Sequence, residues 1–208
     1  YVDGVEQQSK RIHTPRAGIT RSSAFIGKSN WSDNKLFRGR MSEVRLFDRG
    51  RSATEILAGY CEPAVTGQAG LVRLYRLDDA QGTVAADASG SSAHGTIAGP
   101  LTRAGRLFDG PGDFARLPTI DGDLSSGGFT LEAWVYSAEL VDWGRIVELA
   151  TKPGLDGSNI SLSRVASSDE IALRFFDASA VVIADVRAAG ALPLHTWVHI
   201  AVSFKPMV

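Results

Sequence analysis

The stretch Phe129-Thr-Leu-Glu-Ala-Trp-Val-Tyr136 decides the fold class. Its residues at positions 129, 131, 133 and 135 are apolar and alternate with the set at 130, 132, 134 and 136, which places the two sets on opposite sides of an extended strand. The stretch Trp197–Phe204 alternates in the same way, with positions 198, 200, 202 and 204 on its apolar side. Two such segments predict long β-strands that each turn one face toward a core, and Trp134 and Trp197 are expected to be core residues.

Seven further segments have the length and the apolar content of strands, at 24–27, 41–47, 72–77, 104–108, 145–149, 159–163 and 171–176. Clusters of Gly, Asp, Asn, Ser and Pro separate them, which is typical of turns. Many short strands at this spacing predict an all-β, antiparallel, two-sheet jelly-roll sandwich. One short helix is expected near residues 53–60, because Ser52 and Glu55 can form a capping box and Gly59 and Pro63 follow closely.

Composition excludes several classes of protein. The chain has 208 residues, of which 44% are apolar, and its 22 Lys and Arg against 23 Asp and Glu give a net charge of −1. Nucleic-acid binding and polybasic membrane binding are therefore not expected. No apolar run is long enough to predict a membrane span, and the single cysteine, Cys61, excludes an internal disulfide framework. Without an initiator Met, the chain is expected to be part of a longer secreted protein.

Several motifs in residues 71–208 resemble those of one family. They are Leu74-Tyr-Arg-Leu-Asp78, Ala86-Asp-Ala-Ser-Gly90, His94-Gly-Thr-Ile97, Gly105-Arg-Leu-Phe-Asp-Gly110, Asp113-Phe-Ala-Arg-Leu-Pro118, Phe129–Val135 and Trp197–Val202. Together they resemble the opening two-thirds of a laminin-G-like jelly roll of the concanavalin A-like lectin/glucanase superfamily. Residues 1–60, with Phe25-Ile-Gly27 and the segment 37–49, resemble the closing third of the same fold.

The resemblance therefore implies that the last third of the fold comes first in this chain. Residues 1–60 and 71–208 amount to one jelly roll, with 59–70 as the linker. Three arrangements follow. The two parts can close within one chain as a circular permutant, residues 1–60 can complete a neighbouring copy head to tail, or the chain can be an arbitrary cut through tandem domains. Exposed strand edges disfavour the third arrangement.

Catalysis is not expected. The paired carboxylates of glycoside hydrolases are absent at strand spacing, and no Gly-x-Ser-x-Gly, His-Glu-x-x-His or phosphate-loop motif occurs. The four histidines are scattered, and ordinary turn and surface positions are expected for them. The sequence thus predicts a protein that is not an enzyme, with a glycoside-active enzyme as a distant alternative.

The family resemblance implies a structural calcium ion. Asp87 and Glu43 would supply carboxylate ligands, with backbone carbonyls near Gly90 and Asp109. Such an ion would fasten residues 1–60 to residues 71–208. The simpler alternative is that Asp87 caps its own turn.

Glycan binding is the other activity that the resemblance implies. Trp31 and Trp143 stand among polar turn residues and are the ring candidates, with Asn30, Asp33, Asp142 and Arg145 as polar partners. The alternative is that each ring covers an edge of the sandwich. The overall prediction is a non-catalytic extracellular binding or adhesion module for a glycan or a cell-surface protein. The competing prediction is a structural subunit that self-associates head to tail through residues 1–60.

Overall fold

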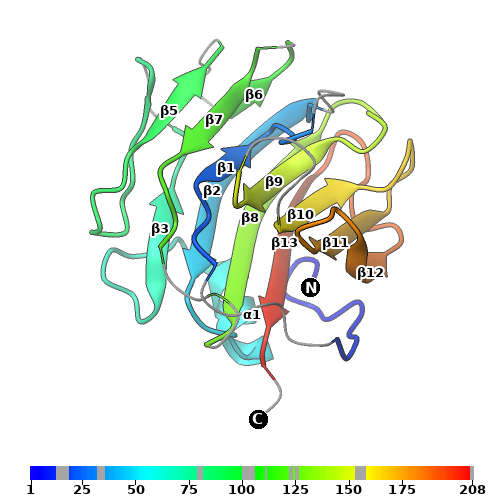
Figure 1. The fold of residues 1–208 in the computed structure, drawn as a ribbon, viewed down its shortest axis with the longest axis horizontal. Helices are drawn as coiled ribbons and strands as arrows, with labels where there is room; N and C mark the ends of the chain where they lie inside the picture. Colours follow the sequence, from blue (N-terminus) through cyan, green and yellow to red (C-terminus); the bar gives the residue numbers. More distant parts are fainter. Residues whose placement is uncertain are drawn as a thin grey trace.

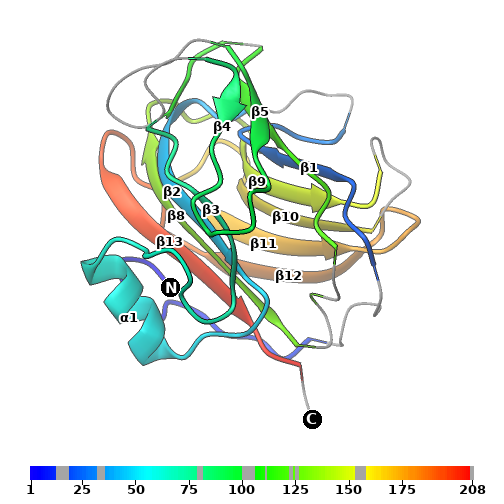
Figure 2. The ribbon, with the colours of Figure 1, turned by 90° about the vertical axis from the view of Figure 1, so that its left-hand side faces the viewer.

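The described part of the chain forms two antiparallel β-sheets stacked face to face, with one helix outside them (Figures 1 and 2). The computed structural model describes residues 1–12, 19–31, 36–78, 82–99, 106–110, 112–121, 124, 127–152 and 158–206. The predicted all-β sandwich is confirmed, because the described residues are mostly strands and pack around an apolar layer.

Within the described residues, the larger sheet has eight strands. In spatial order they are β12 (Val182–Ala188), β11 (Ile171–Phe176), β10 (Asn159–Arg164), β9 (Arg145–Ala150), β1 (Ser23–Ile26), β7 (Phe114–Leu117), β5 (Gly95–Ala98) and β4 (Val84–Ala85). Strands β4, β5, β7 and β12 are additional to those expected from alternation. Three of them have two to four residues, and β12 alternates weakly because much of it is exposed at the sheet edge.

The smaller sheet runs in the order β13 (Trp197–Phe204), β8 (Phe129–Ser137), β2 (Gly39–Phe47) and β3 (Leu71–Tyr75), and β6 (Arg106–Phe108) also pairs with β2. Strands β8 and β13 pair along their whole length, from Trp197 opposite Tyr136 to Phe204 opposite Phe129. Their inward residues, such as Leu131 and Ile200, meet inward residues of the larger sheet, such as Val147 and Leu162. This layer is the core of the sandwich.

Residues 1–60 contribute to both sheets of the same chain. Strand β1 lies between β7 and β9, and β2 lies between β3 and β8. At the edge of the smaller sheet, Val2 bridges Ile200 and the Ala201 N–H donates to the Tyr1 carbonyl over 3.0 Å. One copy of the chain thus supplies every strand neighbour of β1 and β2.

A tight Asp-Gly turn follows this bridge. Val2 and Val5 exchange backbone hydrogen bonds of 2.9 Å, and the two residues between them, Asp3 and Gly4, have φ of 49° and 79°. Both central residues are in the left-handed region, as the tight two-residue hairpin turn requires.

Helix α1 (Ala53–Cys61) covers the outer face of the smaller sheet, as Figure 2 shows. The predicted capping box is present: the Ser52 hydroxyl accepts from the Glu55 N–H, and the Glu55 carboxylate accepts from the Ser52 N–H. The helix extends one residue beyond the predicted end. Its Tyr60 ring stacks on Trp134 at 5.4 Å, so α1 buries an aromatic ring that points away from the sandwich core.

Three expectations for side chains on this outer face are wrong. Trp134 is half-buried beneath Tyr60 instead of lying in the sandwich core, because it occupies the side of β8 that faces away from the larger sheet. Trp197 is 37% exposed instead of being a core residue. Helix α1 packs on Trp134 through Tyr60 and does not extend over the Trp197 end of β13. His199 is completely buried instead of lying at the surface, because Tyr60 of α1 and Trp134 pack on it.

Candidate functional site

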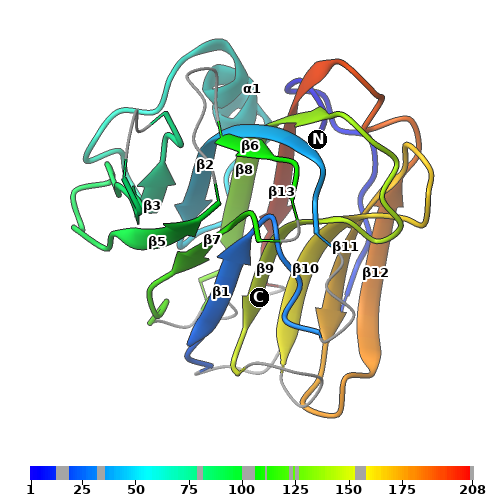
Figure 3. The ribbon, with the colours of Figure 1, turned by 90° about the horizontal axis from the view of Figure 1, so that it is seen from above.

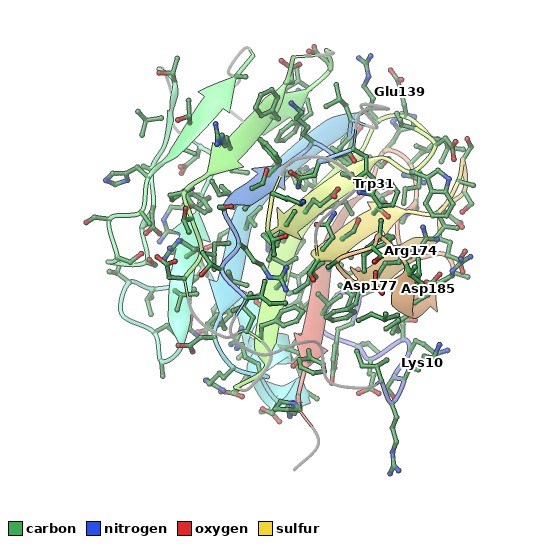
Figure 4. All side chains as sticks on the ribbon, viewed as in Figure 1. Lys10, Trp31, Glu139, Arg174, Asp177 and Asp185 are labelled. Atoms are coloured by element: carbon green, nitrogen blue, oxygen red, sulfur yellow. The ribbon has the colours of Figure 1, made fainter. Side chains whose placement is uncertain are left out.

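The outer face of the larger sheet carries a row of polar side chains. The register places Glu148 of β9 beside Ser161 of β10, Ser161 beside Arg174 of β11, and Arg174 beside Asp185 of β12. The Arg174 guanidinium contacts the Asp185 carboxylate at 3.2 Å, and Arg187 contacts the same carboxylate at 2.8 Å. In Figure 4, Arg174 and Asp185 lie next to one another on this face, with Trp31 nearby.

Trp31 reaches this face from the segment that follows β1. Its half-buried ring meets Phe176 edge to face at 5.0 Å, and the Arg145 guanidinium lies 5.2 Å from the ring centre. Asn30 is only 8% exposed and holds the segment in place, because its side chain bonds both the hydroxyl and the carbonyl of Ser23. Asn30 therefore positions Trp31 and does not point into solvent.

Trp143 reaches the same face from the loop between β8 and β9. The Arg174 guanidinium lies 3.9 Å from its ring centre, and Arg145 donates to the Trp143 carbonyl over 2.6 Å. The φ of Trp143 is 54°, so the backbone is in the left-handed region that a bulky residue rarely adopts. Asp142 beside it is half-buried, whereas the remaining predicted partner, Asp33, lies outside the described residues.

Arg145 joins the two tryptophans. Its side chain is 3% exposed, with one nitrogen on the Trp143 carbonyl, its Nε 3.0 Å from Glu148 and its guanidinium near Trp31. Glu148 is completely buried, and this burial raises its pKa against the opposing effects of Arg145 and Asn159. The predicted residues Trp31, Asn30, Trp143, Asp142 and Arg145 thus lie in one region, which is lined by charged groups.

Sequence reasoning did not identify Glu148, Arg174 or Asp185. Each lies on a strand, and only the pairing of that strand with its neighbours shows that the three residues share this face. Positions 148, 161 and 174 are polar and alternate with apolar residues along their strands. A strand face exposed to solvent has the same pattern, so these positions alone do not indicate a binding site.

Glu148 and Asp185 are too far apart to act together in glycoside hydrolysis. Glu148 and Asp185 occupy one row but are separated by three strand-to-strand steps, which corresponds to about 14 Å. The retaining and inverting mechanisms need carboxyl groups about 5 to 9.5 Å apart. Glu148 is also held by Arg145 and Asn159, so its contacts are structural.

The contacts of Asp87 do not fit a calcium ligand. One carboxylate oxygen accepts from the N–H groups of Leu74 and Ser89, and the other accepts from the hydroxyls of Ser89 and Ser91 and from the Ala93 N–H, all at 2.7–3.0 Å. Five donors leave little room for an ion. These hydrogen bonds outweigh the opposing effect of burial and hold the pKa of Asp87 at about 2.

The Glu43 carboxylate fits a calcium ion no better. The Glu43 carboxylate is paired with Arg45 at 2.9 Å and with Arg76 at 3.2 Å, and it accepts from the Ala64 N–H. The Asp109 and Gly110 N–H groups donate to Asp113, which closes that turn, and Gly90 occupies a turn at φ 100°. In the described part of the chain, no group of three or more His, Cys, Asp or Glu is arranged to hold a metal ion.

A comparison with known families agrees with this architecture. The chain matches the laminin-G-type family described as the concanavalin A-like lectin/glucanases superfamily, over residues 1–57 and 109–206. No curated protein and no solved structure matches it significantly. In the described residues no helix is both long and apolar enough to cross a bilayer. The two matched segments cover most of the chain, and both sheets draw strands from each, so the protein belongs to the concanavalin A-like lectin/glucanases superfamily.

Proposed function

We propose that the chain is a non-catalytic, extracellular binding module that recognises glycan through the outer face of its larger sheet. The observation that carries the proposal is that Arg145 contacts two tryptophans from separate loops, the ring of Trp31 and the backbone carbonyl of Trp143. Laminin-G-like domains are generally binding modules and are typically extracellular, which supports the class of function and the location.

The chemistry of the face suits a sugar. Pyranose rings stack their C–H faces on aromatic rings, while neighbouring charged and amide groups bond the hydroxyls. Trp31 and Trp143 supply two half-buried rings, and the Arg174–Asp185 pair supplies donors and acceptors beside them. Because Arg174 lies over Trp143 and contacts Asp185, the rings and the polar groups are held in one arrangement before a ligand arrives.

A glycan array followed by calorimetry with the best binder tests this proposal. We expect the parent chain to bind, and Trp31→Ala and Trp143→Ala to weaken binding at least tenfold each. Trp197→Ala is the matched control, because Trp197 is 37% exposed but lies on β13 of the other sheet. No glycan signal for the parent chain, or loss of binding in the control alone, would overturn the proposal.

A further inference from the structure

A cavity of about 250 Å³ lies between the two sheets, on the side where the β10–β12 end of the larger sheet faces β13. Its apolar lining comes from both sheets and includes Leu162, Leu173, Phe175, Val186, Val202 and Phe204. Residues 6–12 cover it from outside, and Figure 3 shows this N-terminal segment running between β13 and β12. The cavity lies on a different part of the molecule from Trp31 and Trp143, which line none of it.

The core of the sandwich is incompletely closed at this cavity. Leu173, Val202 and Ile12 pack against the core yet are only partly buried, whereas Leu131 and Val147, deeper between the sheets, are 2% and 1% exposed. Part of this apolar surface remains in contact with water, and binding of an apolar group that covers it is favourable. The lining therefore offers a favourable site for a hydrocarbon group.

The rim of the cavity is cationic. Four lining residues carry positive charge, namely Lys10, Arg11, Arg187 and Lys205, and one, Glu6, carries negative charge. The charge of Arg187 is matched by Asp185 and Glu170, at 2.8 and 3.8 Å.

The other three cationic side chains are exposed: Lys10, Arg11 and Lys205. Lys10 donates a hydrogen bond to a neutral group, the Asp185 carbonyl. The rim thus attracts an anion while the interior attracts an apolar chain.

The covering segment can open. Residues 6–12 belong to no helix or strand, and the hydrogen bond recorded between them and the described strands joins Lys10 Nζ to the Asp185 carbonyl at 3.2 Å. A segment held by few bonds opens locally at low free-energy cost. A ligand can therefore reach the cavity without separating the sheets.

We propose that this cavity binds a small amphipathic monoanion, a medium-length hydrocarbon chain that ends in a carboxylate. The chain lies among Leu173, Val186 and Phe204, and the carboxylate meets Lys10, Arg11 and Lys205 at the rim. The volume is just below the usual range for sites that hold drug-sized molecules, which favours a single acyl chain over a larger lipid.

Calorimetry of the parent chain with octanoate, decanoate, dodecanoate and tetradecanoate tests the proposal directly. Each added methylene that enters the cavity should tighten binding about fourfold, until the cavity is full and the affinity levels off. Decanol, which lacks the charge, should bind at least tenfold more weakly than decanoate. Absence of binding, or an affinity that does not change with chain length, would overturn the proposal.

Two variants locate the site. Leu173→Trp fills the cavity and should weaken decanoate binding at least tenfold, with an unchanged circular dichroism spectrum. The double variant Lys10→Glu/Lys205→Glu reverses charge at the rim and should weaken decanoate binding while leaving decanol binding unchanged. Arg116→Glu, an equally exposed charge reversal on β7, is the control and should bind decanoate as the parent does. Equal loss in the control and the rim variant would overturn the assignment of the site.

Discussion

Arg45 of β2 and Glu132 of β8 form an ion pair of 3.1 Å with both side chains almost completely buried. The same carboxylate also contacts the buried guanidinium of Arg51 and lies 3.6 Å from His199. Arg45 and Arg51 belong to residues 1–60, whereas Glu132 belongs to the rest of the chain. One buried carboxylate therefore links the two parts beneath helix α1, in addition to the backbone pairing of β2 with β8.

Removing that carboxylate should destabilise the fold strongly. In Glu132→Gln the buried Arg51 guanidinium loses its ion-pair partner, and the buried Arg45 keeps only its pair with Glu43. Breaking a buried pair in this way costs about 3–5 kcal/mol of unfolding free energy. Urea denaturation measures the change. Glu170→Gln is the control, because its pair with Arg187 is exposed and should contribute less than about 1 kcal/mol. A loss as small as that of the control would contradict the assigned role of Glu132.

Gly59 should not tolerate alanine, even though it lies in a helix. Alanine has the higher helix propensity by about 1 kcal/mol, but a Cβ at Gly59 would lie 2.9 Å from Arg45 Nη1 and 2.9 Å from Glu132 Oε2. We expect Gly59→Ala to lower the melting temperature, because the charged cluster must shift. Gly112→Ala, where a Cβ meets nothing within 4 Å, should leave it unchanged. A stabilised Gly59→Ala would show that α1 sits farther from the sheet.

Acid should weaken the fold through Asp87. Its folded pKa is about 2, below the usual 3.8, so its contribution is present above about pH 4 and is lost as the pH falls toward 2. Stability measured between pH 5 and 2 should fall in the parent chain and fall less steeply in Asp87→Asn. Parallel pH profiles would mean that other groups carry the acid sensitivity.

Calcium should not stabilise the protein through Asp87 and Glu43. Both carboxylates are occupied by protein donors, and a ligand raises the melting temperature only if it binds the folded state. Melting temperatures in calcium and in chelator should therefore agree. A rise in calcium that Asp87→Asn abolishes would restore the calcium site that the family resemblance implied.

The chain should be a monomer at all concentrations. Strands β1 and β2 find all their neighbours within one copy, so head-to-tail exchange of residues 1–60 is not needed to complete either sheet. Light scattering over a hundredfold range of concentration measures the mass. A mass that increases with concentration would favour the segment-exchange subunit over one permuted jelly roll closed within a single chain.

Local sequence was sufficient for many elements and insufficient for the site. Alternation predicted β8 and β13 nearly to the residue, since two-residue periodicity depends only on which face of a strand is buried. The capping box predicted where α1 begins, because its two hydrogen bonds join residues three apart. The same reasoning misplaced Trp197, because alternation shows that a strand has two faces but does not show which part of the outer face α1 will cover.

The sandwich class, the turn at Asp3-Gly4 and the helix start were readable from short stretches, because each depends on neighbours within a few residues. The row from Glu148 to Asp185 depends on the register of four paired strands, and the position of Trp31 beside Arg145 depends on the pairing of β1 with β9, which lie far apart in the chain. Register is set by how whole sheets pack, and a shift of one residue would turn the strand side chains of this row to the opposite face. The candidate surfaces therefore follow from the three-dimensional packing.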